Sequence, residues 1–286
     1  MLLKKLAAEY QFRKGRRNKD IGMLQLASSN SRQLNRAAIE LAKLGVPDQV
    51  CGALLTNLDT LRTYRDRSSI SDDTVEVLQQ AVLHLQNSRG QFFQDVAAFH
   101  FSGSKRNGFF VEVGTGNGEH LSNTYMLEKS YGWSGVLFEP NRKFAQEIEN
   151  CRTAVLDRRA AYSSDNESLT FIENSTAGEL STLSQYAESD KRTEGSKYTV
   201  ECVTLNSAFE QHSVPSKIDF LSIDTEGSEI DVLDGLDLCR FDIKFMVVEH
   251  NGDFEKKQEI INRLQKYGYK EVCKEISCID AWVTKH

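Results

Sequence analysis

The sequence predicts an α/β fold, in which a small helical domain precedes a mostly parallel sheet covered by helices. From residue 109 onward, short apolar runs alternate with helical segments, a pattern typical of such a sheet. Between residues 33 and 90, apolar residues recur at spacings of three and four, which indicates amphipathic helices. We therefore expect a helical domain with a basic leader over residues 1–100 and an α/β domain over residues 101–286.

Three helices are expected in the amino-terminal part. The first ends at Gly45 and Pro47, which are typical stop signals, and the second continues the apolar spacing from residue 50 to residue 61. The third begins near Ser71, whose hydroxyl can cap it, and runs to Gly90. Their apolar faces could build a homodimer interface.

In the α/β part, short apolar runs predict four buried strands, at residues 109–113, 135–139, 218–224 and 243–249. Helices are expected to begin near Gly118, Asn141, Ser228 and Phe254, and residues 269–273 and 279–284 to form a hairpin. Two alternating stretches, at residues 168–172 and 198–204, flank a segment rich in Ser, Thr and Glu, which we expect to form a mobile loop or lid.

Composition places the chain among soluble proteins. It has 40% hydrophobic and 27% charged residues, and no run approaches the roughly 18 apolar residues of a membrane span. The six cysteines contain no C-x-x-C pair, and the first 20 residues lack the apolar core of a secretory signal, so we expect a cytoplasmic protein.

Charge is distributed unevenly. Residues 1–36 contain nine Lys and Arg against Glu9 and Asp20, although the whole chain has a net charge of −6. Such an arm could contact a membrane surface, nucleic acid or an acidic partner, or could be a solvated leader. The acidic remainder argues against a nucleic-acid substrate, because phosphate binding uses Lys and Arg.

A glycine-rich turn is the strongest local motif. Residues 110–118, FVEVGTGNG, form an apolar strand that enters three alternating glycines. A dinucleotide-binding turn would place its third glycine one position later, where this chain has Glu119. Glu112 and Glu119 would also repel phosphates and attract an ammonium or sulfonium group. A dinucleotide is therefore disfavoured.

Glu139 ends the next predicted strand. It lies about twenty residues beyond the last glycine, where an acidic side chain in such sheets accepts hydrogen bonds from ribose hydroxyls. A glutamate at a strand end can also be a solvated or capping residue. The preceding glycine turn favours the ligand-binding interpretation.

Four segments in a fixed order carry a family resemblance: residues 110–114 (FVEVG) followed by 121–124 (LSNT), 132–141 (GWSGVLFEPN), 218–229 (IDFLSIDTEGSE) and 247–251 (VVEHN). They resemble the FkbM-type methyltransferases, a branch of the class I enzymes that use S-adenosylmethionine. The resemblance implies a Rossmann-like, seven-stranded sheet, with the adenine near Ala160 and Ala161. The cofactor-binding residues that we expect are Glu112, Gly114, Gly116, Gly118, Ser122, Glu139, Pro140, Ala160 and Asp224.

The chemistry is expected where two neighbouring strands end. Asp224, Glu226, Glu229 and His250 fall at this carboxyl edge, where open α/β sheets bind ligands. Asp224, Glu226 and His250 could supply a general base for a hydroxyl, or Asp224 and Glu226 could bind Mg²⁺ or Mn²⁺, which would lower the hydroxyl pKa. Glu229 could instead be an ordinary residue of a first helical turn, and His250 a structural histidine.

The resulting hypothesis is O-methylation of a hydroxyl on a sugar, glycan or other natural product, with the acceptor class taken from the resemblance. An N-methyltransferase is a first alternative, because nitrogen needs less help from a base. A non-catalytic binding or scaffold protein that keeps the fold is a second alternative.

Overall fold

The computed structural model describes residues 70–174, 178–187 and 195–285. The first two expected helices and the basic leader lie outside these residues. Within the described residues, no helix combines the length and the apolar character needed to cross a membrane.

The main sheet has seven strands in the order β10-β11-β9-β8-β1-β2-β3. Strands β9, β8, β1, β2 and β3 run parallel, whereas β11 pairs antiparallel with both β9 and β10, so the sheet is mixed. The bounds of the strands are β1 (Phe109–Val113), β2 (Ser134–Phe138), β3 (Val155–Asp157), β8 (Lys217–Ile223), β9 (Asp242–Glu249), β10 (Lys270–Glu271) and β11 (Asp280–Thr284). The four predicted strands and the hairpin are all present.

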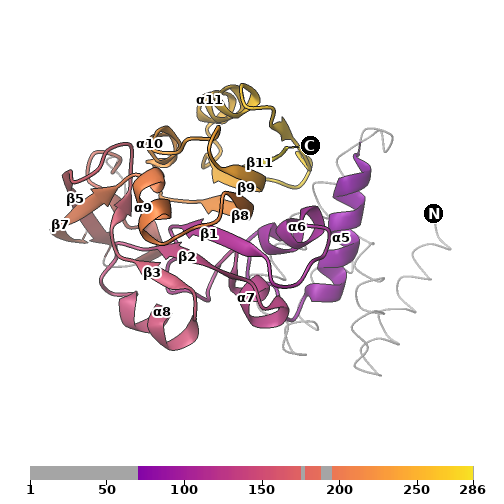
Figure 1. Cartoon of the computed structure of the whole chain (residues 1–286), viewed down its shortest axis with the longest axis horizontal. Helices are drawn as coiled ribbons and strands as arrows, with labels where there is room; N and C mark the ends of the chain where they lie inside the picture. The colour runs from indigo at the N-terminus through magenta and orange to yellow at the C-terminus, as the bar shows by residue number, and fades with distance from the viewer. Residues whose placement is uncertain (1–69, 175–177, 188–194, 286) are drawn as a thin grey trace, which may run out of the picture.

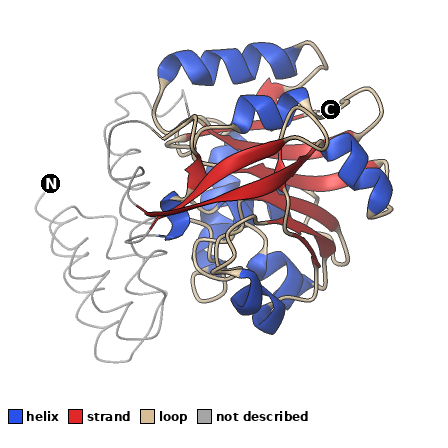
Figure 2. Ribbon diagram, turned by 90° about the vertical axis from the view of Figure 1, so that its left-hand side faces the viewer, coloured by secondary structure: helices blue, strands red, loops and turns tan. Residues whose placement is uncertain are grey.

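Helices cover both faces of this sheet (Figure 2). Alternate residues of β9 divide between two cores: Phe245 and Val247 pack on one face, Met246 and Val248 on the other. The first face carries α5 (Asp72–His84), α6 (Gln94–Phe101), α7 (Tyr125–Tyr131) and α8 (Ala145–Cys151). The second carries α9 (Leu205–Gln211), α10 (Glu229–Asp234) and α11 (Phe254–Gln265).

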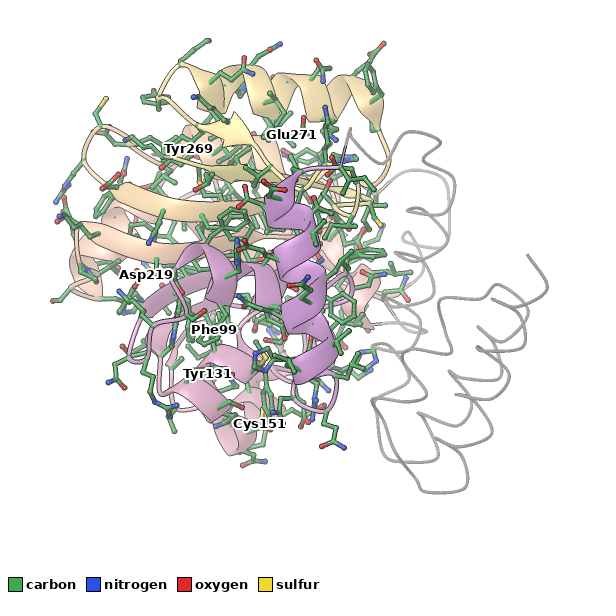
Figure 3. The ribbon with its side chains drawn as sticks, turned by 90° about the vertical axis from the view of Figure 1, so that its right-hand side faces the viewer. Phe99, Tyr131, Cys151, Asp219, Tyr269 and Glu271 are labelled. Carbon is green, nitrogen blue, oxygen red and sulfur yellow. The ribbon has the colours of Figure 1, made fainter. Side chains whose placement is uncertain are left out.

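Helix α5 begins as predicted but packs directly on the α/β body. The Ser71 hydroxyl accepts a hydrogen bond from the Thr74 amide, which caps the helix, and the helix ends at His84. Its buried apolar residues, Val77 and Ala81, share one core with the sheet strands. Helix α6 links this core to α7 through Phe99, which stacks on Tyr131 with ring centroids 3.9 Å apart (Figure 3). The described part of the predicted helical domain is therefore built onto the sheet.

A second, four-stranded sheet has the order β4-β7-β5-β6. Its strands are β4 (Ala160–Ala161), β5 (Ser168–Asn174), β6 (Thr182–Leu183) and β7 (Gly195–Val203), and a 3₁₀ helix, η2 (Gly178–Leu180), precedes β6. β5 and β7 pair antiparallel along their length, at the end of the molecule opposite α5 (Figure 1). The flanks of the expected mobile segment are therefore ordered strands.

Two helices begin later than predicted. α7 begins at Tyr125 rather than near Gly118, because the backbone between them includes Leu121 with φ +59°, which a right-handed helix does not allow. α8 begins at Ala145 rather than near Asn141, whose side-chain oxygen accepts a hydrogen bond from the Lys143 amide in a local turn.

Candidate active site

A cavity of about 320 Å³ opens at the carboxyl ends of β1, β2, β8 and β9. In the sheet, β2 and then β3 lie on one side of β1, whereas β8 and then β9 lie on its other side. The direction in which successive strands are added therefore reverses beside β1. Open α/β sheets bind ligands at such a switch point, and the volume suits a small ligand. The predicted residues on its wall are Gly114, Gly116, Glu139, Pro140, Ala160, Ala161, Asp224 and Glu226.

The first two glycines of the turn have different functions. At Gly114 (φ +80°) an added Cβ would lie 1.6 Å from the Asp224 carbonyl oxygen, so the ends of β1 and β8 can meet only if this position lacks a side chain. At Gly116 (φ +55°) an added Cβ would meet nothing within 4 Å. Gly114 therefore serves the fold, and Gly116 keeps space open beside the cavity.

Glu112 lies behind the glycine turn rather than on the cavity wall. Its buried carboxylate accepts hydrogen bonds from Thr115 Oγ1 (2.8 Å), Ser122 Oγ (2.9 Å), the Asn123 amide (2.6 Å) and Thr124 Oγ1 (2.5 Å). The prediction that Glu112 and Ser122 face the cofactor is not supported by this placement, because neither borders the cavity. They shape the loop that does.

Arg152 donates hydrogen bonds to two of the hydroxyl groups that bind Glu112, those of Ser122 and Thr124. Its fully buried guanidinium donates to the Gly118 carbonyl (2.9 Å), Thr124 Oγ1 (2.7 Å) and Glu128 Oε2 (2.8 Å). An added Cβ at Gly118 would contact the side chain of Arg152 at 3.2 Å. Gly118, predicted to bind the cofactor, is thus a packing residue that does not border the cavity.

Glu139 borders the cavity between the glycine turn and the end of β2. Its two carboxylate oxygens accept hydrogen bonds from the Gly116 amide (2.8 Å) and the Asn141 amide (2.9 Å), so it joins the glycine turn to the end of β2. Burial raises the pKa of Glu139 to about 7, against the opposing effect of these two hydrogen bonds. The neighbouring wall is apolar and contains Phe138, Ala160 and Ala161.

Three carboxyl groups meet at the ends of β8 and β9. One oxygen from each of Asp224, Glu226 and Glu249 lies within 4.8 Å of the others. Asp224 and Glu249 share a hydrogen bond, which requires a proton on one of them. Burial raises the pKa of both groups, and the charge of Asp224 raises that of Glu249 further. Asn251 Nδ2 donates to Glu249 (2.8 Å) and Glu226 (3.3 Å).

The structure does not bring His250 to this cluster. His250 is buried, does not border the cavity, and accepts a hydrogen bond from the Gly252 amide at Nδ1 (3.1 Å). Burial lowers its pKa. Glu229 is also turned away: it accepts hydrogen bonds from the Thr225 and Gly227 amides and pairs with Lys256 at 2.5 Å. Neither side chain borders the cavity, and His250 Nε2 is buried without a hydrogen-bond partner among the described residues.

Sequence reasoning missed Glu249, although it lies in the same motif as His250, at the last position of β9. It also missed Asn123, which borders the cavity and is only 7% exposed. Asn123 Nδ2 donates to Ser222 Oγ (2.9 Å), and its Oδ1 has no hydrogen-bond partner among the described residues. Gln91, just before α6, and Gln94, the first residue of α6, also border the cavity, and no motif marks them.

Residues 112–271 match the family model of the methyltransferase FkbM domain. The match covers more than half of the chain, which therefore belongs to the FkbM methyltransferase family and has the class I methyltransferase fold that this family implies. The resemblance seen in the sequence motifs is thereby confirmed. Searches of curated proteins and of solved structures found no match.

Proposed function

We propose that this protein is an S-adenosylmethionine-dependent O-methyltransferase that acts on a hydroxyl group of a sugar, glycan or other natural product. The observation that carries the proposal is one cavity that joins the glycine turn and Glu139 to the Asp224 and Glu249 carboxyl pair. The family match supports methyl transfer, and the acceptor class comes from the family resemblance.

The cavity suits each part of the cofactor. Phe138, Ala160 and Ala161 offer an apolar wall for an adenine ring, and Glu139 offers carboxylate oxygens for ribose hydroxyls. Asn123 has a buried acceptor without a partner among the described residues, which suits a cofactor that carries an ammonium group. When bound, S-adenosylmethionine would supply an electrophilic methyl group.

The carboxyl pair would remove the proton of the acceptor hydroxyl. An alcohol is a poor nucleophile until its proton is leaving, and a positioned base contributes about 10²- to 10⁴-fold in rate. A carboxylate whose pKa is raised by burial is a stronger base than one in water, so Asp224, paired with Glu249, is the candidate. The donor set Asp224, Glu226 and Glu249 would also suit Mg²⁺ or Mn²⁺, which prefer oxygen ligands.

Two experiments test the proposal in sequence. Calorimetry with S-adenosylmethionine should detect a single site, and release of S-adenosylhomocysteine should then appear with oligosaccharides or cell extracts. Binding without release in any extract would favour the scaffold alternative, and no binding would refute the proposal. If a chelator abolishes the release and Mg²⁺ or Mn²⁺ restores it, the carboxyl groups act through a metal; an unchanged rate assigns Asp224 as the base.

A further inference from the structure

A short segment that precedes the family domain forms part of the cavity wall. This segment, residues 89–95, contains Gln91 and Gln94, which border the cavity, whereas the family match begins later in the chain. The segment is joined to the loop after the glycine turn, because Gly90 forms a parallel bridge with Leu121, which also borders the cavity. The cavity is therefore enclosed in part by residues outside the matched domain.

Buried side chains fix the conformation of this segment. The fully buried carboxylate of Asp95 accepts a hydrogen bond from the Arg89 amide (2.8 Å). Gln94 Oε1 accepts a hydrogen bond from the Phe92 amide (2.7 Å), and Gln94 Nε2 donates to Asp280 Oδ2 on β11 (2.8 Å). Hydrogen bonds within the protein thus hold the segment in place beside the cavity.

Asn123 borders the same cavity from the loop between β1 and α7. Its backbone amide donates to Glu112 (2.6 Å), and its Nδ2 donates to Ser222 Oγ on β8 (2.9 Å), so the side chain is held at both ends. Its Oδ1 is buried and has no hydrogen-bond partner among the described residues. Because a buried acceptor without a partner is unfavourable, this position favours a ligand that donates a hydrogen bond.

The donor that suits Asn123 is the ammonium group of the cofactor. The apolar wall of Phe138, Ala160 and Ala161 suits the adenine, and Glu139 suits the ribose, so the polar wall formed by Asn123 and the segment 89–95 is left for the amino-acid part. An ammonium group has three hydrogens to donate and accepts none, which matches a carboxamide oxygen that lacks a donor.

We propose that Asn123 and the segment 89–95 form a subsite for the amino-acid part of S-adenosylmethionine, in which Asn123 Oδ1 accepts a hydrogen bond from the ammonium group and Gln94 holds the segment beside it. This inference rests on the proposed function. It gives a binding role to residues that lie before the family domain. It also makes Asn123 a specificity-determining residue, which separates the cofactor from nucleosides that lack an amino acid.

Calorimetry with two thioethers tests the subsite without an acceptor. S-adenosylhomocysteine carries the amino-acid part, and 5′-methylthioadenosine has the same nucleoside and sulfur with a methyl group in its place. The wild-type protein should bind S-adenosylhomocysteine at least tenfold more tightly. Asn123→Leu should lower this affinity about tenfold, because it removes a hydrogen bond to a charged group, and should change the affinity for 5′-methylthioadenosine less than twofold. Asn123→Asp keeps the acceptor oxygen and should keep the preference for S-adenosylhomocysteine.

A second variant tests the segment. Gln94→Leu removes the two hydrogen bonds that hold the segment, so it should lower the affinity for S-adenosylhomocysteine at least threefold and leave that for 5′-methylthioadenosine within twofold. Asn262→Leu is the matched control, because it makes the Asn123→Leu replacement at an exposed position on α11 outside the cavity, and it should bind both ligands as the wild type does. Circular dichroism checks that the variants are folded.

Three results would overturn the inference. The first is equal affinity of the wild-type protein for the two thioethers, which would leave a nucleoside site without an amino-acid subsite. The second is a folded Asn123→Leu or Gln94→Leu that keeps the wild-type preference. The third is an Asn123→Asp that loses the preference as fully as Asn123→Leu. Failure of the wild-type protein to bind either thioether is a different result, because it removes the proposed function itself.

Discussion

Replacing Gly116 with valine tests the cofactor site most directly. The backbone at Gly116 has φ +55°, a left-handed conformation that costs a residue with a side chain about 1–2 kcal/mol. No atom lies within 4 Å of the added Cβ, so the free protein should incur little further steric cost. Because domains are stable by about 5–15 kcal/mol, Gly116→Val should remain folded.

The affinity of Gly116→Val for the cofactor should fall much more than its free energy of unfolding. Gly116 borders the cavity, and the branched side chain would occupy space that a bound ligand needs. We expect the Kd for S-adenosylmethionine to rise at least tenfold, which corresponds to about 1.4 kcal/mol. Isothermal titration calorimetry measures the Kd, and thermal unfolding followed by circular dichroism measures the stability.

Two other glycines provide controls. Gly103 has a similar backbone (φ +77°) and equally open surroundings but does not border the cavity, so Gly103→Val should lose similar stability and keep its cofactor affinity. Gly114→Ala should fail to fold properly, because its Cβ would overlap the Asp224 carbonyl. A folded Gly116→Val with wild-type affinity, or an equal loss in Gly103→Val, would refute the placement of the cofactor.

Three further predictions concern the acids and the amino-terminal part. Because burial raises the pKa of Glu139 to about 7, the fraction of Glu139 that is ionised increases from pH 6 to pH 8, and the ionised form is the better hydrogen-bond acceptor. The affinity for S-adenosylmethionine, measured by calorimetry, should therefore rise over this range. An equally steep pH profile in Glu139→Gln would contradict this explanation. Glu139→Ala should cost about 1–3 kcal/mol of binding. Asp224→Asn should lower turnover about 10²- to 10⁴-fold and change the cofactor affinity only a few-fold. His250→Asn should keep most of its turnover, because His250 does not border the cavity. If the two variants lost S-adenosylhomocysteine release equally, His250 would again be a candidate base. Deleting residues 1–90 should lower the melting temperature relative to deleting residues 1–69, because α5 is part of the core. Both truncated proteins should still bind the cofactor, because the residues that border the cavity begin at Gln91. Equal melting temperatures would show that α5 is dispensable.

The sequence predicts the central strands well because their signal is local. Residues 109–113 are apolar enough to be buried on both faces of a sheet, and the structure has a strand with these bounds. Pairing between β5 and β7 was missed because it joins segments that are distant in the chain, and their alternating patterns do not reveal the partner.

The site was predicted where a motif fixes both the residue type and its position. Glu139 and Asp224 lie at strand ends, which the apolar runs locate, and both border the cavity. His250 and Glu249 are adjacent in the sequence, and successive residues of an extended chain point in different directions. Histidine chemistry favoured His250, but it lies after the end of β9, where its ring turns to the Gly252 amide.

The loop between β1 and α7 has a thermodynamic consequence for ligand binding. Glu112 and Arg152 hold it from within, through buried hydrogen bonds that involve no ligand. A ligand that binds beside such a loop does not have to order it first, so the conformational entropy of the loop is lost when the protein folds and not when the complex forms. Association should therefore occur in one step at a rate set by diffusion into the cavity, with a heat-capacity change that reflects only the surface the ligand itself covers.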